Sequence, residues 1–223
     1  MAEERIIILG TGSQASVVLD ILQSAGHADR VEGFIACGDE SVAVEAELDD
    51  RPILGGLNDL PDLHARGVRL AALAVQSALV RERVLQQVLT FGFGLISAIH
   101  PSAVIGNRVK VGRGVVICAN AVIVNGSEIG QGCIVSTGAT VEDHCGIGEF
   151  AFIGPGTHLA SNVRVGNAAW VGIGCSVVQG VSIGARSRIG PGSAVISDIP
   201  EGVLAFGVPA QVQHPYDPSE TVV

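Results

Sequence analysis

The 223-residue sequence is poor in aromatic residues, which make up 4% of it, and in charged residues, which make up 16%. It has no run of eighteen apolar residues, and no basic segment precedes an apolar one near its start. Since a membrane-spanning helix needs such a run, we expect a soluble, cytoplasmic chain with no membrane span. The formal net charge of −9 argues against broad nucleic-acid binding, although a small basic pocket for an anionic ligand is compatible with it.

The dominant feature of the sequence is a six-residue repeat that runs without insertion or deletion from Ile99 to Pro200. The first position is aliphatic in all seventeen units, and sixteen of these residues are β-branched. Branching at Cβ favours a buried strand over a helix. The fifth position is mostly small, as at Ala103, Ala121 and Cys133. The repeat therefore predicts short strands whose first and fifth residues face a core.

A second period of eighteen residues lies on top of the first. It is marked by recurring glycines: Gly112, Gly130, Gly148, Gly166 and Gly184, and also Gly154, Gly172 and Gly190. Three hexads therefore make one coil, whose equivalent corners need the same permissive backbone. The pattern predicts an all-β parallel solenoid with three short strands per coil over residues 99–200. A disordered Gly- and Val-rich tract would not keep a strict phase over this length.

Residues 1–98 have a different pattern, in which strands alternate with helices. We expect strands at 5–9, 31–35 and 69–75, and helices at 16–24, 57–65 and 79–91. This alternation predicts a small α/β domain with a Rossmann-like parallel sheet. The repeat stops at Pro200, and residues 201–223 are expected to form a C-terminal tail that frays from His214 onwards.

A glycine-rich loop, Gly10-Thr11-Gly12, follows the first predicted strand and precedes a helix. It resembles a dinucleotide-binding fingerprint, but an NAD site also wants an acidic residue at the end of the second strand, where the sequence has Ala36 and Cys37. A phosphate of a mononucleotide or nucleotide sugar fits the helix N-terminus better. A purely structural turn is the other alternative. The candidate substrate-binding residues are Gly10, Gly12, Ser13 and Gln14.

The cysteines and histidines give no metal motif. None of the five cysteines lies in a C-x-x-C pair, so we expect neither a zinc nor a redox site, nor disulfides. His100, His144 and His158 are 44 and 14 residues apart, and fourteen is not a multiple of eighteen, so His144 and His158 do not share a face. A zinc-dependent hydratase, which would need such a histidine cluster, is therefore disfavoured.

One corner of the repeat is chemically distinctive. The unit Val141–Gly146 places two carboxylates, Glu142 and Asp143, next to His144. A histidine beside a carboxylate is the usual arrangement for general-base catalysis. The alternative is a solvated turn, because such corners are exposed and polar in any solenoid.

Several stretches match a known family. The order of a Rossmann-like domain, the segment 99–103, uninterrupted hexads and the segment 207–210 resembles the sialic-acid O-acetyltransferase and nucleotide-sugar N-acetyltransferase family. The most specific stretches are residues 136–140 and 147–150, on either side of the His144 corner. Members of this family are left-handed β-helix acyltransferases, so the resemblance implies an α/β domain followed by a left-handed parallel β-helix.

The resemblance also implies a function and a site. It implies a homotrimer that uses acetyl-CoA, with active sites between subunits and a nucleotide-linked amino sugar, or a similar small acceptor, on the N-terminal domain. His144, with Asp143, would take a proton from the acceptor. The implied CoA-binding residues are Phe152, Ile173 and Pro191 for pantetheine, Arg186 or Arg188 for the phosphates, and residues 207–210 for the adenine end.

The sequence departs from the family pattern at several of these positions. The family usually has its histidine before the second carboxylate of the corner, whereas here Asp143 takes that place and His144 follows. Phe152 replaces a second histidine, and Ser13-Gln14 stands where Gly-His is usual. A catalytically impaired or non-catalytic relative, which binds a ligand or serves as a scaffold, is therefore the alternative hypothesis.

Overall fold

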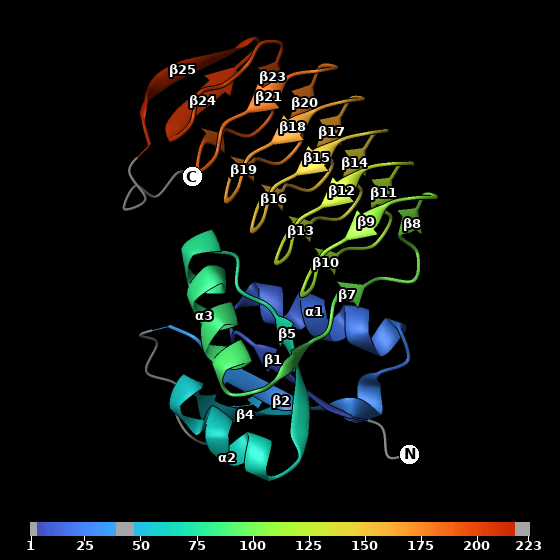
Figure 1. Ribbon diagram of the computed structural model, residues 1–223, viewed down its shortest axis with the longest axis vertical. Helices are drawn as coiled ribbons and strands as arrows, with labels where there is room; N and C mark the ends of the chain where they lie inside the picture. The colour runs from blue at the N-terminus through green and yellow to red at the C-terminus, as the bar shows by residue number, and fades with distance from the viewer. Residues whose placement is uncertain (1–3, 39–46, 217–223) are drawn as a thin grey trace. The chain divides into compact units, whose positions relative to one another are not determined.

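The computed structural model describes residues 4–38 and 47–216, and it divides into two compact units, Met1–Pro101 and Ser102–Val223 (Figure 1). The first unit is an α/β sheet with the strand order β3-β4-β2-β1-β5-β6. Strands β4, β2, β1, β5 and β6 run parallel, and β3 is antiparallel to β4. The strands of this sheet are β1 (Arg5–Leu9), β2 (Val31–Ala36), β3 (Glu47–Leu48), β4 (Arg51–Gly56), β5 (Val68–Leu73) and β6 (Gly94–Leu95); β7 (Ala98–Ile99) follows them in the sequence and is not part of this sheet.

The helices of this unit are α1 (Ser13–Ser24), α2 (Leu60–Ala65) and α3 (Ala78–Thr90). Helix α1 packs on β1, while α2 and α3 pack on β5. Residues 6–9 of β1 are completely buried, as expected for a central parallel strand covered on both faces. The predicted strands and helices are confirmed within a few residues, but β4 was not predicted. Its sequence, with Pro52 and two terminal glycines, lacks a strand pattern, and it is ordered by pairing with β2.

The second unit is the coil that the six-residue repeat predicts. Its two-residue strands form three parallel sheets, one on each side of the coil (Figure 1). The first sheet contains β10 (Val116–Ile117), β13 (Ile134–Val135), β16 (Phe152–Ile153), β19 (Trp170–Val171) and β22 (Arg188–Ile189). The second contains β8 (Val104–Ile105), β11 (Val122–Ile123), β14 (Thr140–Val141), β17 (His158–Leu159), β20 (Ser176–Val177) and β23 (Ala194–Val195). The third contains β9 (Lys110–Val111), β12 (Glu128–Ile129), β15 (Gly146–Ile147), β18 (Arg164–Val165) and β21 (Ser182–Ile183).

The strand register confirms the eighteen-residue period. Ile134 pairs with Phe152, Thr140 with His158, and Gly146 with Arg164, each one coil apart. The first residues of the hexads fill the interior, as Ile123, Val135 and Ile153 do without any exposure. A side chain at the outward sixth position therefore lies directly above its equivalent in the previous coil, which brings residues eighteen apart into contact.

The C-terminal end of the coil differs from the predicted tail. Strands β24 (Val203–Gly207) and β25 (Ala210–Pro215) form an antiparallel hairpin, and β24 pairs with β22 of the first sheet. The prediction that the chain frays from His214 is wrong for His214 and Pro215, because both pair with β24. Residues 217–223 lie outside the described part of the chain. Among the described residues, no helix is long and apolar enough to cross a bilayer.

Candidate active site

The corner between β14 and β15 carries a paired histidine and aspartate. The Nδ1 atom of His144 lies 2.9 Å from Oδ2 of Asp143. Since an ionised carboxylate can only accept hydrogen bonds, Nδ1 is the donor and Nε2 of the neutral ring keeps its lone pair. The imidazole is 58% exposed, so this lone pair is accessible to a substrate. The pair therefore has the geometry of a general base supported by a carboxylate.

Asp143 is held from its other side by the next coil. The hydroxyl of Ser161, eighteen residues later, donates to Oδ1 of Asp143 at 2.5 Å. This hydrogen bond, and secondly the one from His144, lowers the pKa of Asp143 below its ordinary value of 3.8. The carboxylate therefore stays ionised at neutral pH and available to the imidazole.

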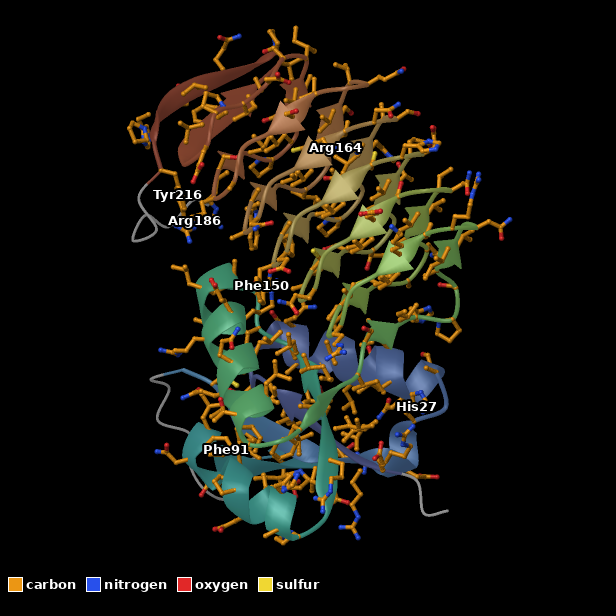
Figure 2. The ribbon with its side chains drawn as sticks, in the orientation of Figure 1. His27, Phe91, Phe150, Arg164, Arg186 and Tyr216 are labelled. Carbon is orange, nitrogen blue, oxygen red and sulfur yellow. The ribbon has the colours of Figure 1, made fainter. Side chains whose placement is uncertain are left out.

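The backbone of His144 is fixed as well. Its φ of 56° lies in the left-handed region, which the fourth residue adopts in every hexad from Ile105 to Ala194 and which is uncommon for a residue other than glycine. Its N–H donates to the carbonyl of Asn125 at 3.2 Å, and Nη1 of Arg164 donates to its carbonyl at 2.5 Å. Figure 2 shows Arg164 on the coil, where it belongs to β18.

His144 borders a groove of about 840 Å³ on the outer face of the third sheet. The groove is lined by glycines, including Gly126 and Gly146, and by the charged residues Lys110, Glu128, Glu149 and Arg164. Lys110 and Glu128 form an exposed ion pair at 2.7 Å. A polar ligand that reaches the base from this side would therefore contact groups of both signs.

A second pocket, of about 210 Å³, lies on the first sheet of the coil. It brings together four of the five predicted CoA-binding residues, namely Phe152, Ile173, Arg188 and Pro191. Arg186, the fifth, is not part of its lining and occupies a left-handed corner position with φ of 56°. Figure 2 labels Arg186 and also Tyr216, which follows β25.

Two residues of this pocket region were missed by the sequence analysis. The indole of Trp170 stacks on Phe152 with ring centroids 3.8 Å apart, and the guanidinium of Arg188 lies 4.7 Å from the centre of the Trp170 ring. Arg188 also donates to the hydroxyl of Tyr216 at 2.7 Å. The eighteen-residue spacing of Phe152, Trp170 and Arg188 was a usable signal, whereas Tyr216 comes from outside the repeat and was not predictable.

A third pocket, of about 250 Å³, lies in the first unit at the carboxyl ends of β1, β2 and β5. All four predicted substrate-binding residues, Gly10, Gly12, Ser13 and Gln14, line it. A Cβ on Gly10 would lie 2.5 Å from the carbonyl oxygen of Ala74, and its φ is +135°. Glycine is therefore required here for the loop to approach β5. Of the described residues that line this pocket, none is charged, and Ser13 and Gln14 belong to the first turn of α1, where the helix dipole has its positive end.

Two arginines of α3, which the sequence analysis also missed, donate hydrogen bonds to the main chain of residues that line this pocket. The buried Arg81 donates through Nη1 to the carbonyls of Val75 and Gln76, at 2.9 and 2.5 Å. Arg83 donates to the carbonyl of Cys37 at 3.1 Å. In the described residues, no group of three or more His, Cys, Asp or Glu side chains is arranged to hold a metal ion.

Comparison with solved structures gives close matches. The protein is 35% identical to perosamine N-acetyltransferase from Caulobacter crescentus, solved as a mutant in complex with CoA and GDP-perosamine. The match covers 95% of this chain and 98% of the other, with a TM-score of 0.88. The acetyltransferase domain of PglB from Neisseria gonorrhoeae, in complex with acetyl coenzyme A, is 27% identical over 95% and 100% of the two chains, with a TM-score of 0.86. WeeI from Acinetobacter baumannii, at 20% identity over 95% and 100% of the two chains and a TM-score of 0.82, shares the fold.

A comparison with family models gives no match, and neither does one with curated proteins. The fold and the 35% identity over nearly the whole of both chains nevertheless define the class, which is that of the left-handed β-helix acyltransferases built from hexapeptide repeats. Within this class, the chain belongs to the sialic-acid O-acetyltransferase and nucleotide-sugar N-acetyltransferase family. The predicted resemblance is confirmed.

Proposed function

We propose that this enzyme transfers the acetyl group of acetyl-CoA to the amino group of a nucleotide-linked sugar, with His144 as the general base. The observation that carries the proposal is the Asp143–His144 hydrogen bond, which leaves Nε2 of an exposed imidazole free to accept a proton. Solved relatives contain CoA with GDP-perosamine, or acetyl coenzyme A. In two of the perosamine enzyme's structures a histidine is replaced, by asparagine or by alanine.

The proposed reaction is a direct acyl transfer. The acceptor nitrogen attacks the thioester carbonyl carbon and forms the new C–N bond, while Nε2 of His144 takes the proton that the nitrogen loses. The tetrahedral oxyanion is steadied by main-chain N–H groups. Collapse of the tetrahedral intermediate breaks the C–S bond. The CoA thiolate that leaves then takes the proton from the imidazolium of His144. Asp143 stabilises the imidazolium that forms between the two proton transfers.

We assign CoA to the pocket on the first sheet. Phe152, Ile173 and Pro191 provide an apolar wall for pantetheine, and Arg188 provides positive charge for the phosphates. Arg186, which lies outside the lining, is the second candidate for the phosphates. Trp170 joins this site because it stacks on Phe152. The hairpin β24–β25, which lies within the predicted C-terminal segment 201–223, borders the CoA site in this assignment. The reason is that Tyr216, the residue after β25, accepts a hydrogen bond from Arg188.

The active site needs more than one copy of the chain. His144 lies at the corner between the second and third sheets, whereas the Phe152 pocket lies on the first sheet. One coil therefore cannot present its own base to a thioester in its own pocket. We propose that a homotrimer brings the pocket of one subunit to the His144 corner of a neighbour, as the family resemblance implies.

The first unit, which the sequence predicts to be Rossmann-like, is proposed to hold the nucleotide of the acceptor. Gly10, Gly12, Ser13 and Gln14 line the pocket at the N-terminus of α1, where main-chain N–H groups and the helix dipole favour a phosphate. The functional domains would then be residues 1–98 for the acceptor and 99–200 for the chemistry. The structure's own boundary, after Pro101, lies three residues further along the chain.

The alternative is a catalytically impaired or non-catalytic relative, since Asp143 stands where the family usually has its histidine. A matched pair of variants separates the two hypotheses. His144→Asn and Arg108→Asn both place asparagine, which tolerates a positive φ, at the same corner of two coils. Release of the CoA thiol is measured with acetyl-CoA and a panel of nucleotide-linked amino sugars. We expect His144→Asn to lower kcat by about 10²- to 10⁴-fold, and Arg108→Asn to leave it unchanged.

Two results would contradict this proposal. If the wild-type protein binds CoA but releases no thiol with any acceptor, the scaffold hypothesis replaces it. If His144→Asn keeps full activity, the base is a different group.

A further inference from the structure

We propose that Ser161 and Arg164, one coil after the dyad, are positioning residues that hold Asp143 and His144 in the orientation needed for proton transfer. The inference rests on the proposed role of His144 as the base. It explains how a histidine one position out of the family's usual order can still serve. The next coil supplies one hydrogen bond to each member of the pair.

Ser161 acts on the carboxylate. Its hydroxyl donates to Oδ1 of Asp143, while the other oxygen, Oδ2, accepts from Nδ1 of His144. The two bonds engage the two oxygens separately, so the carboxylate bridges the serine and the imidazole. The Asp143 side chain is 41% exposed and would otherwise be free to rotate in solvent. The serine therefore fixes the direction in which Asp143 presents Oδ2 to the ring.

Arg164 acts on the main chain of His144. Its side chain lies over Gly146, because a Cβ on that glycine would come within 3.1 Å of Cδ of Arg164. This path brings Nη1 to the carbonyl oxygen of His144 at 2.5 Å. His144 has a left-handed φ of 56°, which costs free energy for a residue with a side chain. The guanidinium therefore stabilises the backbone conformation that aims the imidazole.

The chemical consequence concerns the tautomer of His144. A neutral imidazole without a fixed acceptor at Nδ1 divides between two tautomers, and only the form protonated at Nδ1 can accept a proton at Nε2. The held carboxylate selects that form. Loss of either positioning residue should lower the fraction of correctly oriented base and so lower kcat. It should leave the KM for acetyl-CoA unchanged, because the Phe152 pocket is on another face of the coil.

The test combines kinetics with a readout that does not need activity. Ser161→Ala removes the hydroxyl, Ser161→Thr keeps it, and Ser176→Ala removes an exposed serine hydroxyl on neighbouring β20 as a control. Arg164→Met is the second, independent variant. In each protein, ¹⁵N shifts of labelled histidine report the tautomer of His144, whose signals are identified by their loss in His144→Asn. Steady-state rates give kcat and KM separately.

We expect Ser161→Ala and Arg164→Met each to lower kcat by about 10- to 100-fold at a constant KM for acetyl-CoA, with the Nδ1–H tautomer less populated in Ser161→Ala. Ser161→Thr should keep kcat and the tautomer population of the wild-type protein, and Ser176→Ala should change neither quantity. Unchanged ¹⁵N shifts and unchanged kcat in Ser161→Ala and Arg164→Met would overturn the inference. If the wild-type protein transfers no acetyl group, the proposed function fails by itself, and the tautomer shift in Ser161→Ala still decides whether the next coil orients the dyad.

Discussion

The imidazole of His144 lies against the main chain of Gly126, its equivalent one coil earlier. A Cβ built on Gly126 would come within 3.1 Å of both Cδ2 and Nε2 of the ring. The absence of a side chain at residue 126 therefore leaves the space in which the proposed base sits. Both residues line the groove on the third sheet, so the base and the space beside it belong to one surface.

Gly126→Ala should accordingly disturb the base without removing it. The new methyl group would lie 3.1 Å from Nε2, so the ring must shift by a few tenths of an ångström. We expect a fall in kcat smaller than the roughly 10²-fold that a displacement of about 1 Å can cost. Gly180→Ala is the matched control, because Gly180 occupies the same corner with φ of +76°, against +74° for Gly126, but has open space around its Cβ position. Both variants carry the same backbone strain. Equal activity of the two would show that the contact with His144 has no catalytic consequence.

CoA binding should be visible in the fluorescence of the protein. Trp170 is the only tryptophan of the chain, and it lies in the wall of the proposed CoA pocket. We expect CoA to change its emission in a saturable titration. Phe152→Ala removes the ring on which Trp170 stacks and should raise the Kd for CoA roughly 3- to 10-fold, from the free energy of an aromatic pair. A CoA titration that leaves the emission unchanged while calorimetry detects binding would place CoA elsewhere.

The ionisation of Asp143 should report its two hydrogen bonds. The pKa of Asp143 in the folded protein is lowered, first by the hydrogen bond from Ser161 and then by the one from His144. Ionisation of Asp143 therefore stabilises the folded state fully at pH values above its ordinary pKa of 3.8. That contribution is lost as the pH falls through the lowered value. A ¹³C titration of the Asp143 carboxyl group should give a midpoint below 3.8, and Ser161→Ala should move it upwards. A midpoint at or above 3.8 in the wild-type protein would contradict the bonded geometry.

The loop before α1 should depend on glycine at residue 10. Gly10→Ala puts a methyl group 2.5 Å from the carbonyl oxygen of Ala74 and forces alanine to a φ of +135°. We expect it to lower the free energy of unfolding by about 1–3 kcal/mol or more, measured by thermal or denaturant unfolding. Gly12→Ala is the stability control, since its Cβ would lie in open space. Similar Tm values for the two variants would contradict the predicted clash.

The five cysteines should resist thiol reagents in the folded protein. None of the five forms a disulfide and all are buried, and burial raises the pKa of Cys118 to about 11. Because the thiolate is the reactive form, Cys118 is almost wholly unreactive at neutral pH. We expect slow labelling by a chromogenic disulfide in the native state and rapid labelling of five thiols after unfolding. Rapid labelling of Cys118, Cys133, Cys145 or Cys175 in the native protein would show that the coil opens readily.

Much of this architecture was readable from the sequence. The six-residue period identified the inward positions, and the eighteen-residue period identified which residues stack, as the pairing of Ile134 with Phe152 shows. The corner with Asp143 and His144 was recognisable because carboxylates and histidine together are rare in such a repeat. The strand β4 and the hairpin β24–β25 were not predicted, because their order comes from pairing with β2 and β22 rather than from a local pattern.

The sequence by itself determined the coil, its phase and the identity of the chemically distinctive corner, because a repeat imposes the same geometry on each unit. The tertiary structure decided what each of those residues touches. It showed that Ser161 bonds Asp143, that Arg164 crosses Gly146 to reach His144, and that Trp170 stacks on Phe152. These contacts depend on side-chain direction and on empty space above glycines. A linear pattern specifies which residues are neighbours, but only the packed coil fixes which atoms meet.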